Sequence, residues 1–373
     1  MKVVHLLPAL EQGGVETVVC DLVRELGNRE QGSSFAKATE DKSGNRWESV
    51  VISKGGRLVG KIEAAGGRHI ALDLKSKNPL TYFTRAWKLR KILRAEKSDL
   101  VCVHSRVPAW LFVWANRGLG LKWITYAHGA NSVSCYSAVM TKGDLVVTPS
   151  RFLADYLKSN YGTPEAKIRV IPNSVDTERF NPENLDQSFI AEKKREWGIR
   201  EGDRVIMAIG RITPVKGLEA LIRDFKGDKL IIVGGADKHH QKYLQDLKNL
   251  ASAVHVGRSP CSGYFDLRSQ SHLSPSPVVF AGQQEKIPEC ISIADEIVSA
   301  NTTKPETFGL SVIEAYAMNK PVRAKRFGGV AEVMAAVEKA GKPTLREAVI
   351  SLYAPDLQAV RTLAAYRELV NMV

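Results

Sequence analysis

The chain has 373 residues, more than one hydrophobic core usually accommodates, so two domains are expected. Its residues are 44% hydrophobic and 25% charged, a composition typical of globular proteins and unlike that of disordered or fibrous chains. A formal net charge of +13 favours anionic partners such as nucleotide phosphates, acidic lipids or nucleic acids, without choosing among them.

The five cysteines are scattered and include no C-x-x-C pair. Neither a disulfide framework nor a zinc site is indicated, and a cytoplasmic, reducing compartment fits best. The first residues, MKVVHLLPALEQGG, carry a short apolar run without a cleavage signal, which indicates a strand rather than a signal peptide. No run approaches the roughly 20 apolar residues that span a bilayer, so any membrane contact is expected to be peripheral.

Short β-branched runs alternate with amphipathic stretches along the chain. In the first half these stretches are KVVHLL, GVETVVCDLVREL, ESVVIS, TYFTRAWKLRKILRAE, DLVCVHS and WITYAHG. The alternation resumes in the second half with the strand-like runs RVIMAIG, KLIIVGG, VVFAG and EIVSA. This alternation predicts parallel sheets flanked by helices. We predict two Rossmann-like domains over 1–175 and 201–355, a linker over 176–200 and a final helix over 356–373 that could lie across either domain.

Two polar segments interrupt this rhythm. Residues 29–46 separate the first helix from its strand, and residues 257–277 lie between VHV and VVFAG, two strand-like pieces where one would suffice. We predict that both segments are surface insertions. For the second segment, a long active-site loop is the alternative.

The segment KPETFGLSVIEAYAMNKP predicts a helix from Phe308 to Met318 whose apolar stripe contains Glu314. A carboxylate on such a stripe is either paired with a cation or held for the hydroxyl groups of a ligand. Glu306 lies just before the helix. Gly309 would let a ligand approach the free amides of the first turn, which form an anion site.

A second segment, AIGRITPVKGLEALI, places Arg211 and Lys216 on a loop between a strand and a helix. The order of residues differs from a Walker P-loop. Two cations in a loop most often form a solvated surface. Their occurrence together with the two carboxylates favours a phosphate-binding function instead.

On these residues the chain resembles the family 4 glycosyltransferases, retaining enzymes of the GT-B fold, in which two Rossmann-like domains face each other across a cleft. The run from Glu306 to Glu314 is similar to the E-x7-E signature of that family. The resemblance implies that Glu306 is catalytic, beside the donor hexose, and that Glu314 binds the ribose. It implies that Arg211 and Lys216 clamp the donor pyrophosphate. It also implies donor-binding positions at Phe308, Gly309 and Leu310.

The N-terminal half carries weaker motifs of the same family. Gly13, Gly14 and Glu16 form a G-G-x-E turn, which implies donor-phosphate contacts for the glycines and an acceptor contact for the carboxylate. His128 follows the strand WITYA. A lone histidine is more often structural, but the resemblance implies a catalytic contact with the donor.

Two further stretches, HSRVPAW and CYSAVMTKGD, resemble members that build lipopolysaccharide core or other envelope glycans. This resemblance implies acceptor contacts at Ser105, Arg106 and Tyr136.

No Asp-x-Asp motif ends a strand and no His or Cys cluster has metal spacing, so we expect neither a metal nor another cofactor. The expected partners are a nucleotide-sugar donor and a glycan or lipid-linked acceptor; no motif supports binding to nucleic acid. The basic helix from Tyr82 to Lys97 also carries Phe83 and Trp87, which would suit peripheral contact with the inner membrane. A core-packed helix with a solvated basic side is the favoured interpretation.

Two other functions stay open. A catalytically impaired relative that binds a glycan or a partner protein is motivated by the two insertions and by Arg323, where the family usually has an apolar strand residue. A sugar-nucleotide epimerase on the same fold is the second. The Glu306 and Glu314 pair, together with Arg211 and Lys216, favours the glycosyltransferase.

Overall fold

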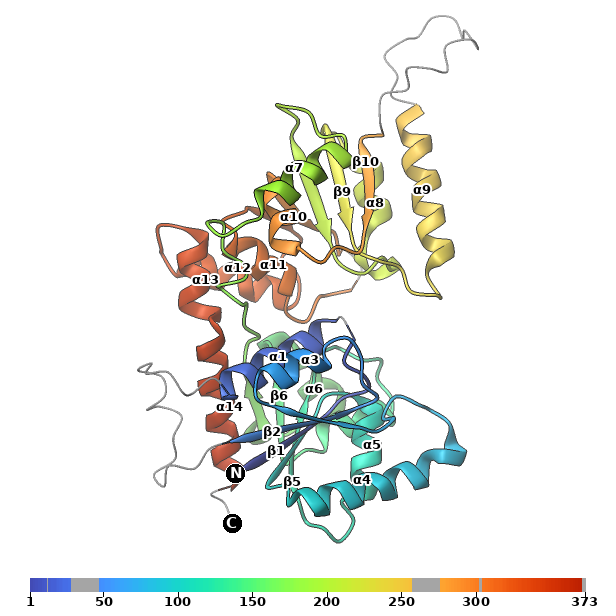
Figure 1. The fold of residues 1–373 in the computed structure, drawn as a ribbon, viewed down its shortest axis with the longest axis vertical. Helices are drawn as coiled ribbons and strands as arrows, with labels where there is room; N and C mark the ends of the chain where they lie inside the picture. The colour runs from blue at the N-terminus through green and yellow to red at the C-terminus, as the bar shows by residue number, and fades with distance from the viewer. Residues whose placement is uncertain (12, 28–46, 257–275, 302–303, 371–373) are drawn as a thin grey trace, which may run out of the picture. The chain divides into compact units, whose positions relative to one another are not determined.

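The computed structural model describes residues 1–11, 13–27, 47–256, 276–301 and 304–370. They form two compact units, one of Met1–Asp176 with Tyr353–Val373 and one of Thr177–Leu352 (Figure 1). The insertion predicted over 29–46 lies outside the described residues. So does the one predicted over 257–277, apart from its last two residues.

The first unit is built on a parallel sheet whose described strands have the order β3-β2-β1-β4-β5-β6-β7. The strands are β1 (Lys2–Leu6), β2 (Glu48–Ser53), β3 (Arg68–Ala71), β4 (Leu100–Val103), β5 (Lys122–Tyr126), β6 (Leu145–Thr148) and β7 (Ile168–Val170). The α-helices are α1 (Gly14–Gly27), α3 (Val59–Ala64), α4 (Tyr82–Glu96), α5 (Arg106–Ala115), α6 (Arg151–Tyr161) and α14 (Pro355–Val370). Short 3₁₀ turns lie at Pro79–Thr81, Ser137–Thr141 and Glu165–Lys167.

Helices cover both faces of this sheet, which is why the middle parts of its strands are largely apolar. Val4 and Val101 pack under α4 and α5, whereas Val3 and Cys102 pack under α1 and α14. Figure 1 shows α1 and α3 on one side of β1 and β2, and α4 and α5 on the other. Strands buried on both faces read as continuous hydrophobic runs.

The C-terminal helix α14 belongs to the first unit. The sequence left open which domain it covers, and its packing answers that question. Tyr366 is fully buried against Cys102 and Tyr126. Arg169 on β7 pairs with Glu368 of the helix.

The second unit is built on a smaller parallel sheet with the described strand order β10-β9-β8-β11-β12. The strands are β8 (Val205–Ile209), β9 (Lys229–Val233), β10 (Val278–Gly282), β11 (Glu296–Ser299) and β12 (Val322–Ala324). The helices are α7 (Gln187–Glu196), α8 (Leu218–Asp224), α9 (Gln241–Val256), α10 (Ile287–Ile293), α11 (Leu310–Ala317), α12 (Gly329–Lys339) and α13 (Leu345–Tyr353), with a 3₁₀ turn at Pro214–Lys216.

Two details of this unit differ from the sequence-based expectations. The segment 176–200, expected to be a linker, contains α7, which packs against α10. The strand-like piece VHV is instead the last turn of α9. Its β-branched residues favour a strand only weakly, and such a propensity is readily overridden by context.

The strand orders fix where a ligand would bind in each unit. In the first sheet the order reverses between β1 and β4, and in the second between β8 and β11. Open parallel sheets bind ligands in the crevice outside the carboxyl ends of the strands at such a switch point. The loops after these four strands are therefore the places to look for function.

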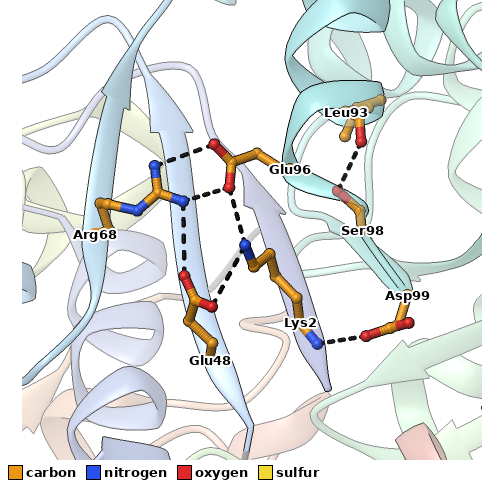
Figure 2. Close-up of polar contacts among 7 residues, drawn as sticks. All are labelled: Lys2, Glu48, Arg68, Leu93, Glu96, Ser98 and Asp99. Atoms are coloured by element: carbon orange, nitrogen blue, oxygen red, sulfur yellow. Dashed lines mark hydrogen bonds and ion pairs between the residues drawn. The ribbon is translucent and has the colours of Figure 1, made fainter.

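The opposite, amino edge of the first sheet is held by a network of charged side chains (Figure 2). Lys2 on β1 lies 3.2 Å from Glu96 at the end of α4 and 3.4 Å from Glu48 on β2. Arg68 on β3 pairs with the same two carboxylates. The network ties three strands to the helix that packs beneath them.

We expect Glu96→Gln to destabilise the protein by about 1 kcal/mol at neutral pH, the size of a partly exposed ion-pair network. The hydrogen bonds from Arg68, and next those from Lys2, hold the pKa of Glu96 below its usual range. A carboxylate with a lowered folded-state pKa contributes stability above its unfolded pKa and loses it as pH falls through the folded one.

Urea unfolding of both proteins across pH checks this. The difference in unfolding free energy should be constant near neutrality and shrink as pH falls below about 4.3, the ordinary glutamate pKa. Glu63→Gln, at an exposed position on α3, is the control. A difference independent of pH down to the acid transition would contradict the role of the ion pairs.

Candidate active site

A pocket lies at the switch point of the second sheet, where the loops after β8 and β11 meet. The neighbouring loops after β8 and β9 also approach closely, since a Cβ on Gly234 would lie 1.8 Å from the carbonyl oxygen of Gly210. The lining residues come from β8, β9, β11 and the loops that follow them. They are Ala208, Ile209, Gly210, Arg211, Lys216, Leu218, Ile232, Val298, Ser299, Ala300 and Asn301.

The structure brings Lys216 and Glu306 together in this region. The Lys216 Nζ lies 3.1 Å from Glu306 Oε1, and the amide of Asn301 donates to Glu306 Oε2 at 3.3 Å. Both carboxylate oxygens are therefore held. Arg211 lies exposed on the same loop as Lys216, so two cations line the pocket and the carboxylate fixed by Lys216 and Asn301 lies beside it.

The helix after Glu306 is shorter than predicted, because α11 begins at Leu310. Gly309 caps it with φ 97°, a backbone conformation that L side chains rarely adopt, and a Cβ there would meet Val330 Cγ2 at 2.8 Å. Glycine is thus required by the backbone itself. Asn319 ends the segment in the left-handed conformation, with φ 54°.

The other predicted residues of this segment differ in exposure. Glu314 is half-buried on α11 beside the fully buried Ile313. Phe308 is only 4% exposed, so its side chain belongs to the core and only its backbone could reach a ligand. Leu310 is half-buried at the first turn.

Gly13, Gly14 and Glu16 lie between the end of β1 and the first turn of α1, at the carboxyl edge of the first sheet. Gly14 is the first residue of α1, and Gly13 O accepts hydrogen bonds from the backbone and the hydroxyl of Thr17. The Glu16 carboxylate folds back so closely that a Cβ on Gly13 would lie 2.4 Å from Glu16 Oε2. The turn is compact, and a larger residue at Gly13 would displace the flexible end of the Glu16 side chain.

His128 follows β5 and is part of a hydrogen-bonded chain of histidines. Its Nε2 lies 3.1 Å from Nδ1 of His104, whose Nε2 lies 3.1 Å from Nδ1 of His5. Burial lowers the pKa of His128 and that of His5 to about 4 each, and it lowers the pKa of His104 well below its usual range. All three rings are therefore neutral at neutral pH.

The predicted acceptor residues lie near one another. Ser105 precedes α5, and Arg106 begins it. The Arg106 guanidinium donates to Ser137 Oγ at 3.1 Å and stacks 5.4 Å from the centre of the Tyr136 ring. Tyr136 is 41% exposed, so this cluster offers an aromatic face and a cation to solvent.

Sequence reasoning missed three residues of these sites. Asn301 lies two residues after β11, His5 is the last but one residue of β1, and His104 directly follows β4. Each occupies a strand end at a switch point, and that position was the available signal.

Arg323, suspected of weakening the site, lies exposed on the edge strand β12. It pairs with Glu296 of the neighbouring strand at 3.0 Å. It is not among the residues that line the pocket.

Comparisons with known proteins agree with the resemblance. The family model described as Glycosyltransferase Family 4 matches residues 12–179, and the one described as Glycosyl transferases group 1 matches residues 189–341. The lipopolysaccharide 1,2-N-acetylglucosaminetransferase of Salmonella typhimurium is 24% identical over 270 residues, 68% of this chain and 62% of that one. The chain spans about half the length of the curated relatives that it matches.

Solved structures show the fold. A glycosyltransferase from Rickettsia africae superposes with a TM-score of 0.75 at 22% identity, covering 100% of this chain and 99% of that one. HepE from Anabaena in complex with UDP-glucose superposes with a TM-score of 0.74 at 16% identity, covering 99% and 100%. The fold is thus that of GT-B enzymes, with two Rossmann-like domains.

Proposed function

The chain belongs to family 4 of the glycosyltransferases, and on that premise we propose that it transfers a hexose-type sugar from a nucleoside-diphosphate donor to a glycan or lipid-linked acceptor. The anomeric configuration is retained in this proposal. The reaction serves the cytoplasmic synthesis of lipopolysaccharide or another envelope polysaccharide. The Salmonella relative, named for lipopolysaccharide, and HepE, solved with UDP-glucose, support this choice of acceptor and donor.

The observation that carries the proposal is the cluster of Lys216, Glu306 and Asn301 at the switch point of the second sheet. Lys216 and Arg211 would hold the donor pyrophosphate, since lysine and arginine are the usual partners of phosphate oxygens. The half-buried Glu314 would bind the ribose hydroxyls. Glu306, fixed by its two partners, would lie beside the hexose.

The proposed chemistry follows from these charges. As the bond from the anomeric carbon to the phosphate oxygen lengthens, negative charge develops on the diphosphate and positive charge on the sugar ring. Arg211 and Lys216 stabilise the first and the Glu306 carboxylate stabilises the second. The acceptor hydroxyl attacks on the face that the diphosphate leaves, and its proton passes to the departing diphosphate oxygen. In this proposal the two cations supply the charge for which other transferases use a divalent metal.

A panel of nucleotide sugars tests the proposal, with released nucleoside diphosphate as the readout and EDTA in a parallel series. One donor should give diphosphate release that EDTA leaves unchanged. A nucleoside diphosphate should also raise the melting temperature. Absence of release and of any thermal shift across UDP, GDP and ADP series would refute the proposal. Release that EDTA stops would refute the metal-independent part.

We also propose that the first unit docks on an anionic bilayer through α4 and the turn before it. Leu80 is 88% exposed, and Phe83 and Trp87 are each 58% exposed. The buried Arg85 donates to the carbonyl oxygens of Asp73, Asn78 and Thr81 and thereby fixes the turn that carries Leu80. No described helix is long and apolar enough to cross a bilayer.

The charge around this apolar ridge suits acidic lipid headgroups. Lys91 lies 4.6 Å from the centre of the Trp87 ring and Arg117 lies 3.9 Å from that of Trp114. Exposed cations on and beside this helix include Lys77, Lys88, Lys91, Arg94 and Arg117. The helix nevertheless packs on the core through Ala86, Leu89 and Leu93, as the favoured sequence interpretation expected. Aromatic side chains beside lysine and arginine are typical of surfaces that insert into the headgroup region.

We expect the triple variant Leu80→Ser, Phe83→Ser, Trp87→Ser to bind vesicles at least about tenfold more weakly, because each side chain loses apolar burial in the bilayer. Co-sedimentation with phosphatidylcholine vesicles, with and without phosphatidylglycerol, measures this. Phe327→Ser, at an exposed aromatic residue of the second unit, is the control. Equal binding by both variants, or wild-type binding independent of phosphatidylglycerol, would exclude this docking surface.

A further inference from the structure

Helix α5 of the first unit carries basic and aromatic side chains along one face. Arg106, Trp110 and Trp114 follow one another at intervals of four residues, so they share a face of the helix and each lies about 6 Å further along its axis. Arg106 and Trp110 are half-buried, and Trp114 is 38% exposed. Leu111 and Phe112, by contrast, are fully buried in the core. This face is therefore the part of α5 that is open to solvent.

Both tryptophan rings on this face have a cation beside them. The Lys142 ammonium lies 5.5 Å from the centre of the Trp110 ring. The Arg117 guanidinium lies 3.9 Å from the centre of the Trp114 ring. We call this set of aromatic and basic residues, together with one neighbouring tyrosine, the α5 stripe: Arg106, Trp110, Trp114, Arg117, Tyr136 and Lys142.

The neighbouring segment holds the start of the stripe in place. Trp110 Nε1 donates to the carbonyl oxygen of Tyr136 at 3.0 Å. The Arg106 guanidinium donates to Ser137 Oγ at 3.1 Å and lies 5.4 Å from the centre of the Tyr136 ring. The two rings and the guanidinium are thus arranged relative to one another before any ligand binds.

The cations of the stripe are not balanced by carboxylates. Arg106, Arg117 and Lys142 form no ion pair within the ranges that the structure describes. Lys2 and Arg68 of the same unit each pair with carboxylates. Cations gathered on one face create a positive potential that attracts anionic ligands. Flat aromatic rings add apolar surface, on which the C–H face of a sugar can pack. The combination fits an acidic saccharide better than a neutral one.

The stripe is continuous with the apolar ridge of α4. The Trp114 ring meets the Phe83 ring edge to face at 4.7 Å, and Tyr82 Oη donates to the carbonyl oxygen of Trp110 at 2.7 Å. At the other end Arg106 begins α5 just after β4, at the carboxyl edge of the first sheet. The stripe therefore runs about 12 Å from the ridge to the edge at which such sheets bind ligands.

We propose that the α5 stripe binds the acceptor and that this acceptor is an acidic saccharide attached to a lipid. The inference rests on the proposed function and deepens it, because it names the charge and the direction of the acceptor. The lipid end lies at Trp114, beside the ridge, and the saccharide extends toward Arg106. Its negative groups are carboxylates or phosphates, the anions that arginine and lysine bind in proteins.

Titration calorimetry of the full chain with trigalacturonate and with its trimethyl ester tests the charge of the ligand without any donor. The two probes differ only in the charge of their carboxyl groups. The acid should bind about tenfold more tightly than the ester, and added salt should remove most of that difference. Maltotriosyl phosphate, compared with maltotriose, shows whether phosphate is the preferred anion. If neither charged probe binds more tightly than its neutral counterpart, the proposal is wrong.

Variants locate the binding on the stripe. Lys142→Gln removes an exposed ammonium that forms no described ion pair, so it should leave the fold intact, weaken the charged probe about fivefold and leave the neutral probe unchanged. Trp110→Leu removes a flat ring and should weaken both probes. Lys61→Gln, at an exposed position of α3 on the opposite face of the sheet, is the control (Figure 1). An equal effect of Lys61→Gln and Lys142→Gln would contradict binding at the stripe.

Two further comparisons separate this proposal from the others. If Lys142→Gln weakens binding to phosphatidylglycerol vesicles and leaves saccharide binding unchanged, the stripe is part of the membrane surface and the proposal is overturned. If a charged probe binds at the stripe and no nucleotide sugar is turned over, the proposed function fails and the acidic-saccharide site stands. If diphosphate is released and neither charged probe is preferred, the acidic acceptor fails alone.

Discussion

Lys216→Ala is expected to lower the rate of diphosphate release by about a hundredfold or more, the loss typical when a charged donor to a developing anion is removed. It should also abolish the rise in melting temperature caused by the nucleoside diphosphate. The ammonium group lines the pocket and lies 3.1 Å from Glu306. Its removal takes away one of two cations for the pyrophosphate and leaves a half-buried carboxylate without its ion pair.

Control variants separate the effect on diphosphate binding from the effect on turnover. Lys226→Ala removes an exposed lysine of the same unit and should change neither measurement. Lys216→Arg keeps the charge but not the point geometry of an ammonium, so it should recover diphosphate binding better than turnover. Titration calorimetry with nucleoside diphosphate and steady-state kinetics give the two readouts. Diphosphate binding by Lys216→Ala equal to that of the wild type would disprove the phosphate-binding role.

A double-mutant cycle with Glu306→Gln isolates the interaction between the two side chains. If Lys216 acts partly by fixing the carboxylate, the double variant will be less impaired than the sum of the single effects predicts. Full additivity would mean that Lys216 acts on the donor alone.

The residues of the second unit were predictable because each belongs to a short continuous segment. Glu306 and Glu314 lie eight positions apart around a helix start, and Lys216 stands on one strand-to-helix loop. That Lys216 and Glu306 meet does not follow from any spacing. It depends on β8 and β11 being neighbours, which the strand order alone decides. The sequence motifs identify the residues, and the strand order of the sheet brings Lys216 and Glu306 together.

The histidine chain could not be predicted, because it depends on register between distant strands. His5 pairs with Cys102 across β1 and β4, which places His104 just beyond the neighbouring strand end. Periodicity describes one element at a time and carries no information about this pairing. Arg85 was missed for a different reason, since a charged residue on a helix described as basic is expected to face solvent. The structure buries it, and carbonyl oxygens of the preceding turn satisfy its guanidinium.

Tyr366→Ala is expected to lower the unfolding free energy of the first unit by about 3 to 5 kcal/mol, the usual cost of removing a large buried aromatic side chain. Tyr366 is fully buried, and its ring centre is 5.4 Å from that of Trp47. Its hydroxyl lies 3.3 Å from both Cys102 Sγ and Tyr126 Oη. The cavity would open between α14 and the sheet.

Tyr366→Phe is the matched control, since it keeps the ring and removes only the hydroxyl. It should cost about 1 to 2 kcal/mol, because Cys102 and Tyr126 lose a buried partner. Burial raises the pKa of Tyr126 and that of Tyr366 well above the ordinary tyrosine value of about 10, so both phenols stay neutral. The stability lost in Tyr366→Ala and in Tyr366→Phe should therefore be the same at pH 6 and at pH 8, both well below about 10.

Urea unfolding followed by tryptophan fluorescence reports this change, because Trp47 lies in the affected cluster. If α14 is an integral part of the first unit, Tyr366→Ala will lower the transition that exposes Trp47 and leave the diphosphate-induced stabilisation of the second unit intact. A loss in Tyr366→Ala no larger than in Tyr366→Phe would mean that α14 contributes little to that core. Helix α14 would then be held mainly by surface contacts such as the Arg169–Glu368 pair.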